Sequence, residues 1–139
     1  PLQKLYYQIC SGLLGRLCFS GEPDALSAAQ WAIIDASTAF YGKAASIIDH
    51  GVSQRLGSRI VSYRAPRGWQ AVVRRGETQT LVVVHTFGAA PEAVTLPVGG
   101  KIAAQFMRDG LTVTHPDGQL TVHGFTDFDA AAFILENEG

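Results

Sequence analysis

The spacing of apolar residues changes near Gly57, and this change constrains the fold more than any other feature of the sequence. Before Gly57, apolar residues between Ile33 and Ile48 recur every three or four positions, which is the spacing of one face of an α-helix. After Gly57, short segments alternate apolar and polar residues, as strands with one solvated face do. The sequence therefore predicts a long helix followed by an antiparallel β domain.

The long helix is predicted from Ser27 to Asp49. Gln30 follows Ser27 by three residues, and this is the pattern of a capping box, in which each side chain bonds to the other residue's backbone N–H. Gly51, directly after His50, is typical of a helix end. We expect the apolar face of this helix to be buried.

A short apolar run from Leu13 to Phe19 precedes the helix, and we interpret it as a buried strand that stops at Gly21 and Pro23. A single strand, loop and helix cannot bury both faces of the strand. The unit is therefore either an attachment to another structure or the end of a larger repeated architecture.

The β domain is predicted as an antiparallel sandwich, because short strands alternate regularly with Pro- and Gly-rich turns such as APRG, LPVGG and HPDG. The stretch LVVVHTF is continuously apolar before its histidine, as expected for a central strand covered on both faces. The stretch LTVTHPDGQLTVHG alternates on both sides of a turn, which predicts a hairpin. The predicted strands are Arg59–Arg64, Trp69–Arg74, Thr80–Phe87, Glu92–Leu96, Lys101–Met107, Leu111–Thr114, Gln119–His123 and Ala130–Leu135.

Composition excludes several classes of function. The chain has 139 residues with a formal net charge of −1 and no run of Lys or Arg, so we expect neither nucleic acid nor an anionic membrane surface as a partner. No apolar segment reaches the about 20 residues that cross a bilayer. The N-terminus lacks the pattern of a signal peptide.

No pattern in the sequence indicates a metal or a cofactor. Cys10 and Cys18 form no C-x-x-C pair, and the four histidines lack the spacing of metal ligands. We interpret the cysteines as reduced thiols in a reducing, cytoplasmic compartment; the alternatives are a disulfide or a reactive site. His85 follows a buried run and is interpreted as a hydrogen-bonded core histidine.

A family resemblance rests on the stretches LLGRLCFSGEPDALSAAQW, AFYGKAASIIDHG, GWQAVVRR and LVVVHTF, in this order. They resemble the C-terminal end of α-galactosidase-like glycoside hydrolases of clan D, the melibiases, in which a (β/α)8 barrel is followed by a β-sandwich. The resemblance implies that residues 1–57 are the terminal strand and helix of a truncated barrel and that residues 58–139 are the sandwich. The implied partners are the remainder of the barrel, a galactoside in the full-length protein, and a second copy of the chain.

A complete barrel takes about 250 residues, more than this chain has. The resemblance implies retaining hydrolysis by two carboxylates about 5 to 5.5 Å apart, with the nucleophile in a K-x-D motif on an earlier strand. No such motif occurs here. We therefore assign no catalytic residue and expect this chain to be inactive alone. Its start at Pro1 also favours a fragment.

Ser20, Gly21, Glu22 and Asp24 are the predicted substrate-binding residues, because active sites of such barrels gather at the C-terminal ends of the strands. Gly21 would let a ligand approach the backbone, and the two acidic side chains would accept hydrogen bonds from sugar hydroxyls. The alternative is that Pro23 and Asp24 only form the turn into the helix, where an acidic residue is stabilised by the helix dipole.

Trp69 is the candidate for stacking on a sugar, and Trp31 is the other tryptophan; the alternative for both is packing in a core or at a domain junction. Asp127 and Asp129 are spaced like a pair of glycosidase carboxylates, but we interpret them as part of a solvated turn. Glu136 and Glu138 are interpreted as parts of the tail.

Two further hypotheses stay open. The chain could be a freestanding non-catalytic module that binds a carbohydrate or a protein, or a similar segment of a different barrel glycosidase family. A barrel fragment predicts an exposed apolar patch at Leu13 to Phe19 and on one helix face. A freestanding module predicts that these residues are buried and that an aromatic platform lies outside.

Overall fold

The computed structural model describes residues 2–15 and 25–138. Within them the chain forms two α-helices, eight strands and one short 3-10 turn. In chain order these are α1 (Leu2–Gly12), α2 (Ala28–His50), β1 (Val52–Gly57), β2 (Trp69–Arg75), β3 (Gln79–Thr86), β4 (Ala93–Pro97), β5 (Lys101–Met107), β6 (Thr112–Thr114), the 3-10 turn Pro116–Gly118, β7 (Gln119–His123) and β8 (Ala130–Glu136).

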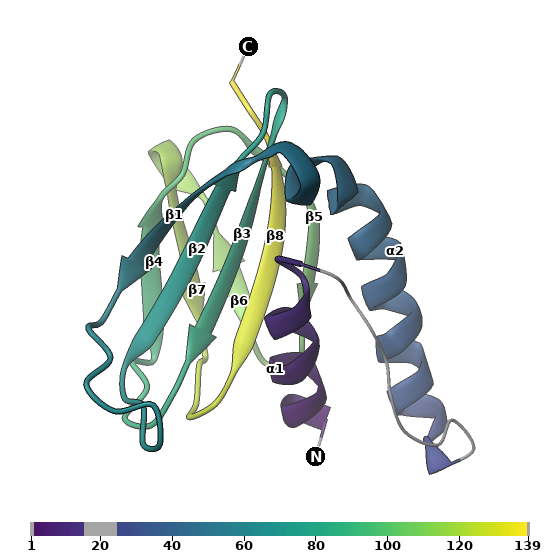
Figure 1. Cartoon of the computed structure of the whole chain (residues 1–139), viewed down its shortest axis with the longest axis vertical. Helices are drawn as coiled ribbons and strands as arrows, with labels where there is room; N and C mark the ends of the chain where they lie inside the picture. The colour runs from purple at the N-terminus through teal and green to yellow at the C-terminus, as the bar shows by residue number, and fades with distance from the viewer. Residues whose placement is uncertain (1, 16–24, 139) are drawn as a thin grey trace.

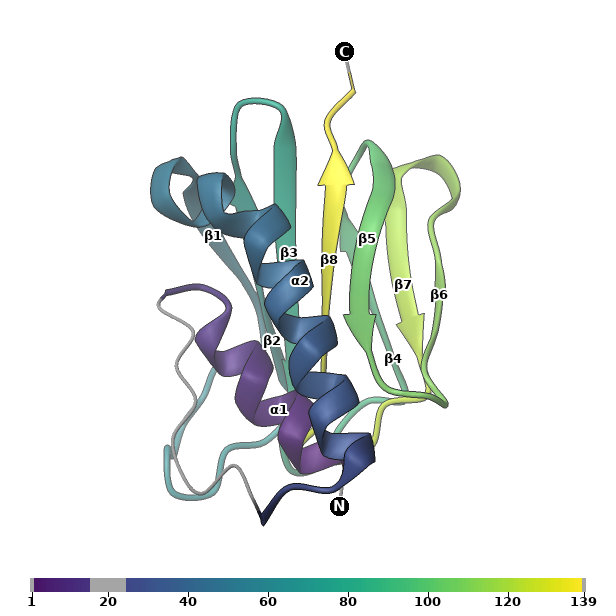
Figure 2. The same cartoon turned by 90° about the vertical axis from the view of Figure 1, so that its right-hand side faces the viewer.

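The elements form three layers. The middle layer is an antiparallel sheet of five strands in the order β1-β2-β3-β8-β5. A second antiparallel sheet, β4-β7-β6, covers one face of it, and α1 and α2 cover the other (Figures 1 and 2). The predicted antiparallel β-sandwich is confirmed at this level, with a layer of helices added to it.

The middle sheet separates two apolar cores, and the central strands contribute to both. On β3, Leu81 and Val83 face the helices, whereas Val82 and Val84 face the second sheet. Successive side chains of a strand point to opposite faces, so a strand buried on both faces is apolar at every position. This confirms that LVVVHTF is a central strand.

Helix α2 begins with the predicted capping box. The Gln30 N–H donates to Ser27 Oγ at 3.1 Å, and the Ser27 N–H donates to Gln30 Oε1 at 2.7 Å. At the other end, the Gly51 N–H donates to the Ile47 carbonyl at 2.8 Å. The buried face of the helix packs on the middle sheet and includes Ile33, Phe40, Ala44, Ile47 and Ile48.

The first strand of the sheet differs from the predicted one. Residues 59–64 form no strand, and β1 lies earlier, at Val52–Gly57, where it pairs with β2 over its whole length. It is an edge strand with mostly exposed side chains, so it carries no alternation of apolar residues. The predicted domain division after Gly57 stays a prediction; β1 lies before it and β2 after it.

The predicted hairpin is confirmed, because β6 and β7 pair across the Pro116–Gly118 turn.

The strand predicted from Leu13 to Phe19 does not begin at Leu13, so this part of the prediction is wrong. Leu13 and Leu14 lie in the turn that follows α1, while Leu17 to Phe19 lie outside the described residues. Leu13 is buried together with Ile9 and Cys10 in the core between the helices and the sheet. Ile9 and Leu13 are four residues apart, so Leu13 extends the apolar face of the helix that precedes it.

Candidate functional site

The four residues predicted to bind substrate, Ser20, Gly21, Glu22 and Asp24, lie outside the described residues. Their role stays a prediction. Trp69 lies at the start of β2, half-buried, with its side chain packed against the core between the two sheets. Its stacking role also stays a prediction.

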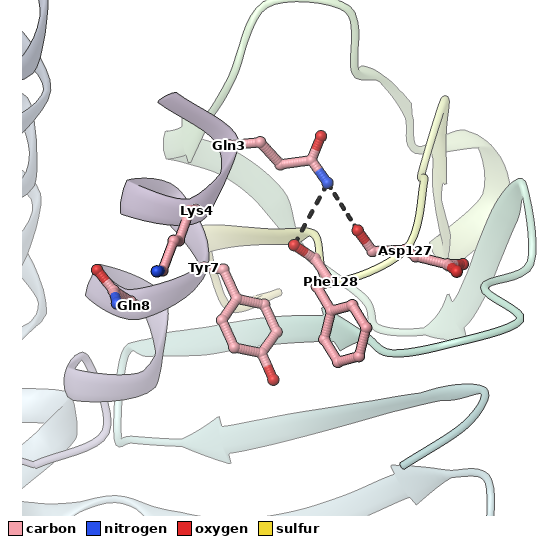
Figure 3. A pocket seen from close by; sticks show the side chains of 6 residues that line it. All are labelled: Gln3, Lys4, Tyr7, Gln8, Asp127 and Phe128. Atoms are coloured by element: carbon pink, nitrogen blue, oxygen red, sulfur yellow. Dashed lines mark hydrogen bonds between the residues drawn. The ribbon is translucent and has the colours of Figure 1, made fainter. Parts of the chain in front are cut away.

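A pocket of about 520 Å³ lies at one end of the sandwich, between α1 and the loop that joins β7 to β8 (Figure 3). Its lining comes from the first two turns of α1 and from two residues of that loop: Gln3, Lys4, Tyr7, Gln8, Asp127 and Phe128. None of these residues was predicted as a site residue, because the two segments are far apart in the sequence.

Gln3 fixes the loop to the helix. Its Nε2 donates to the carbonyl oxygens of Asp127 and Phe128 at 2.8 and 3.3 Å, and its Oε1 accepts from Thr126 Oγ1 at 3.1 Å. The Ala90 N–H donates to Asp127 Oδ1 at 2.9 Å. Hydrogen bonds to α1 and to Ala90 therefore fix the β7–β8 loop in the absence of a ligand.

Two aromatic rings form the apolar part of the pocket. The rings of Tyr7 and Phe128 lie 6.1 Å apart between centroids with planes at 71°. Phe128 has a φ of 54° and is 46% exposed. A bulky residue in the left-handed region is strained, and such strain is concentrated at functional sites.

Asp129 lies beneath the same loop, and its environment corrects the interpretation of a solvated turn. Its side chain is fully buried and accepts hydrogen bonds from Arg108 Nε at 3.0 Å and Arg108 Nη2 at 2.7 Å. The N–H groups of Thr126 and Ala130 also donate to its carboxylate. Asp127, by contrast, is exposed. The two carboxylates thus differ in environment, and Asp129 has a structural role.

No protein-family model and no curated protein matches the chain. In the described part of the chain, no helix is long and apolar enough to cross a membrane. Residues 2–15 and 25–138 also contain no group of three or more His, Cys, Asp or Glu side chains that could hold a metal ion.

His85 joins β3 to α1 beside the pocket. Its Nε2 lies 3.3 Å from the Tyr7 carbonyl oxygen and 3.2 Å from Ser11 Oγ, and its ring meets the Tyr7 ring edge-on. In the tautomer with its proton on Nε2, the imidazole donates to the Tyr7 carbonyl. Burial lowers the pKa of His85, and the hydrogen bond to Tyr7 offsets only part of this effect. The neutral ring is therefore the form that holds α1 to the sheet.

We expect the free energy of unfolding to decrease as the pH falls below about 6.5, the pKa of an unperturbed histidine. The folded-state pKa of His85 is lower than this value. At a pH between the two pKa values the unfolded state therefore binds more protons than the folded state, and lowering the pH favours unfolding. Urea unfolding at a series of pH values measures the effect. His85→Gln should remove this part of the pH dependence, whereas His50→Gln, at the exposed end of α2, should leave it in place. An unchanged pH dependence in His85→Gln would contradict the expectation.

Proposed function

We propose that the chain is the C-terminal part of an α-galactosidase-like glycoside hydrolase, where it supports the (β/α)8 barrel and supplies no catalytic carboxylate. Three features support this proposal. The sequence resembles that family from Leu13 to Phe87. The long helix is followed by a β-sandwich, as in the family. The third feature is the outer surface of α2.

The outer surface of α2 is the observation that carries the proposal. The exposed side of this helix carries small residues at Ala28, Ala29, Ala32, Ala36, Ala39 and Gly42, and its charged residues include Asp35, Lys43 and Asp49. Trp31, on the same helix, is 40% exposed. The opposite face of α2 already packs on the sheet, so the small apolar residues of the exposed side form a second apolar surface that the sandwich does not use. We assign the outer surface of α2 to contact with the remainder of the barrel.

The place of α1 fits the same proposal. Strands and helices alternate in a (β/α)8 barrel, so the last strand has one helix before it and one after it. Helix α1 precedes the segment that contains Leu17 to Phe19, and α2 follows it. The two helices would then be the last two of the barrel.

Cys10 is buried in the core, and burial raises the pKa of its thiol, which suits the reduced cysteine of a cytoplasmic protein.

A freestanding carbohydrate-binding module is the second candidate, and two observations favour it. Leu13 is fully buried, so this residue is not part of an exposed apolar patch. Tyr7 and Phe128 line a surface pocket, as expected if an aromatic platform lies outside. In this case the small residues of α2 would contact a second copy of the chain.

Hydrolysis of a chromogenic α-galactoside tests the proposal. We expect no activity from the 139-residue chain and clear activity from the longest natural reading frame that contains it. Activity of the short chain would contradict the proposal, because it would place catalytic carboxylates among residues to which we assign none. An inactive long protein would contradict it as well and would favour the second candidate.

A substitution on the outer surface of α2 makes this test more specific. Ala39→Glu should change the stability of the short chain by no more than about 0.5 kcal/mol, because Ala39 is exposed there. In the long protein, the same change would bury an unpaired charge against the barrel and should reduce both thermal stability and activity. Equal behaviour of Ala39→Glu and the unmodified sequence in the long protein would remove the main support for the proposed contact.

A further inference from the structure

We propose that the pocket between α1 and the β7–β8 loop binds a saccharide ring. The choice of an α-galactoside as its ligand rests on the proposed function, while the pocket itself does not. Its volume of about 520 Å³ lies within the range of pockets that hold small molecules.

The pocket offers an apolar surface that is fixed in place. The Phe128 backbone is held in its left-handed conformation while Gln3 bonds to the Phe128 carbonyl oxygen, and the ring stays about half exposed. Figure 3 shows the rings of Tyr7 and Phe128 side by side, with the Asp127 carboxylate pointing away from them. A flat apolar face, such as the C–H face of a pyranose, can pack on such rings.

Three polar groups beside the rings have no hydrogen-bond partner among the described residues. Lys4, Tyr7 and Gln8 line the pocket, and the Lys4 ammonium, the Tyr7 hydroxyl and the Gln8 amide make no hydrogen bond to residues 2–15 or 25–138. Figure 3 shows Lys4 and Gln8 on the side of Tyr7 that is remote from Phe128. A sugar packed on one of these rings would present its hydroxyls at its edge, where these groups can bond to them.

Other ligand classes fit the pocket less well. A metal ion would find one carboxylate, Asp127, among the lining residues. An anion would find one cation, Lys4, and the charge of Asp127 lies in the same lining. A wholly apolar ligand would cover the Lys4 and Gln8 side chains and leave them without hydrogen bonds. A neutral ligand with a flat apolar face and hydroxyl groups satisfies all of these groups.

Titration of the 139-residue chain with methyl α-galactoside and raffinose, followed by NMR, tests the proposal. We expect saturable shifts for residues of the pocket and about tenfold weaker binding in Phe128→Ala, from the loss of one aromatic contact. Gln8→Ala, at an exposed helix position, should weaken binding without affecting the fold. Tyr63→Ala is the matched control, because Tyr63 is an exposed aromatic residue outside the pocket. Sorbitol, which has hydroxyls but no ring face, should not compete.

The outcomes separate this proposal from the proposed function. Sugar binding that Phe128→Ala and Gln8→Ala weaken supports the pocket, whether or not the long protein hydrolyses α-galactosides. Absence of saturable binding overturns it even if the long protein is active. Equal binding of sorbitol, or an equal loss in Tyr63→Ala, overturns it too.

Discussion

Asp129→Asn is expected to lower the free energy of unfolding by about 3 to 5 kcal/mol, the usual cost of removing one partner of a buried ion pair. Asp129 is completely buried, and Arg108 has only 19% of its side chain exposed. The guanidinium bonds to both carboxylate oxygens and also donates to the Gly124 carbonyl at 3.0 Å. Neutralising the carboxylate leaves the Arg108 charge without a counter-ion beneath the loop that carries Phe128.

Urea unfolding measures this loss, and a neighbouring residue supplies the control. Asp127→Asn makes the same chemical change two residues earlier on an exposed side chain, and its amide oxygen can still accept from the Ala90 N–H. We expect this variant to stay within about 0.5 kcal/mol of the parent. Arg108→Met combined with Asp129→Asn should lose less than the sum of the two single variants, because no unpaired charge remains. Additive losses would show that the pair is not coupled.

The sequence predicted best those elements that are buried in a regular pattern. The predicted Lys101–Met107 and Gln119–His123 agree with β5 and β7 residue for residue, and the capping box located the start of α2. The edge strand β1 was misplaced because its side chains are mostly exposed, and burial is what creates an alternating pattern. Leu13 was assigned to a strand because a short apolar run fits the end of a helix equally well.

The candidate site could not be predicted because it depends on contacts between distant segments. Gln3 and Asp127 are 124 positions apart, and only the docking of α1 on the sheet brings them together. The left-handed backbone of Phe128 leaves no mark in the sequence, because phenylalanine has no preference for it. The burial of Asp129 had one signal: it directly precedes a strand in which six of seven residues are buried. A charge in that position needs a partner, and Arg108 is that partner.

Phe106→Ala is expected to cost about 3 to 5 kcal/mol and to destabilise helices and sandwich together. Phe106 is 3% exposed on β5 and connects three elements, with its ring centroid 4.9 Å from that of Tyr6 on α1 and 6.2 Å from that of Phe40 on α2. The matched variant is Phe133→Ala on β8, which removes the same side chain from the core between the sheets.

Hydrogen exchange of the two variants tests the predicted division after Gly57. Strands β3 and β8 place alternate side chains in both cores, so a loss in either core should weaken the same sheet. We therefore expect both variants to increase the exchange of amides in α2 and in β7 by similar factors, as in one cooperative unit. If Phe106→Ala increases exchange only in α1 and α2, the helices form a separate unit. The helices would then unfold independently of the sandwich, as expected if they are part of the barrel that we propose they complete.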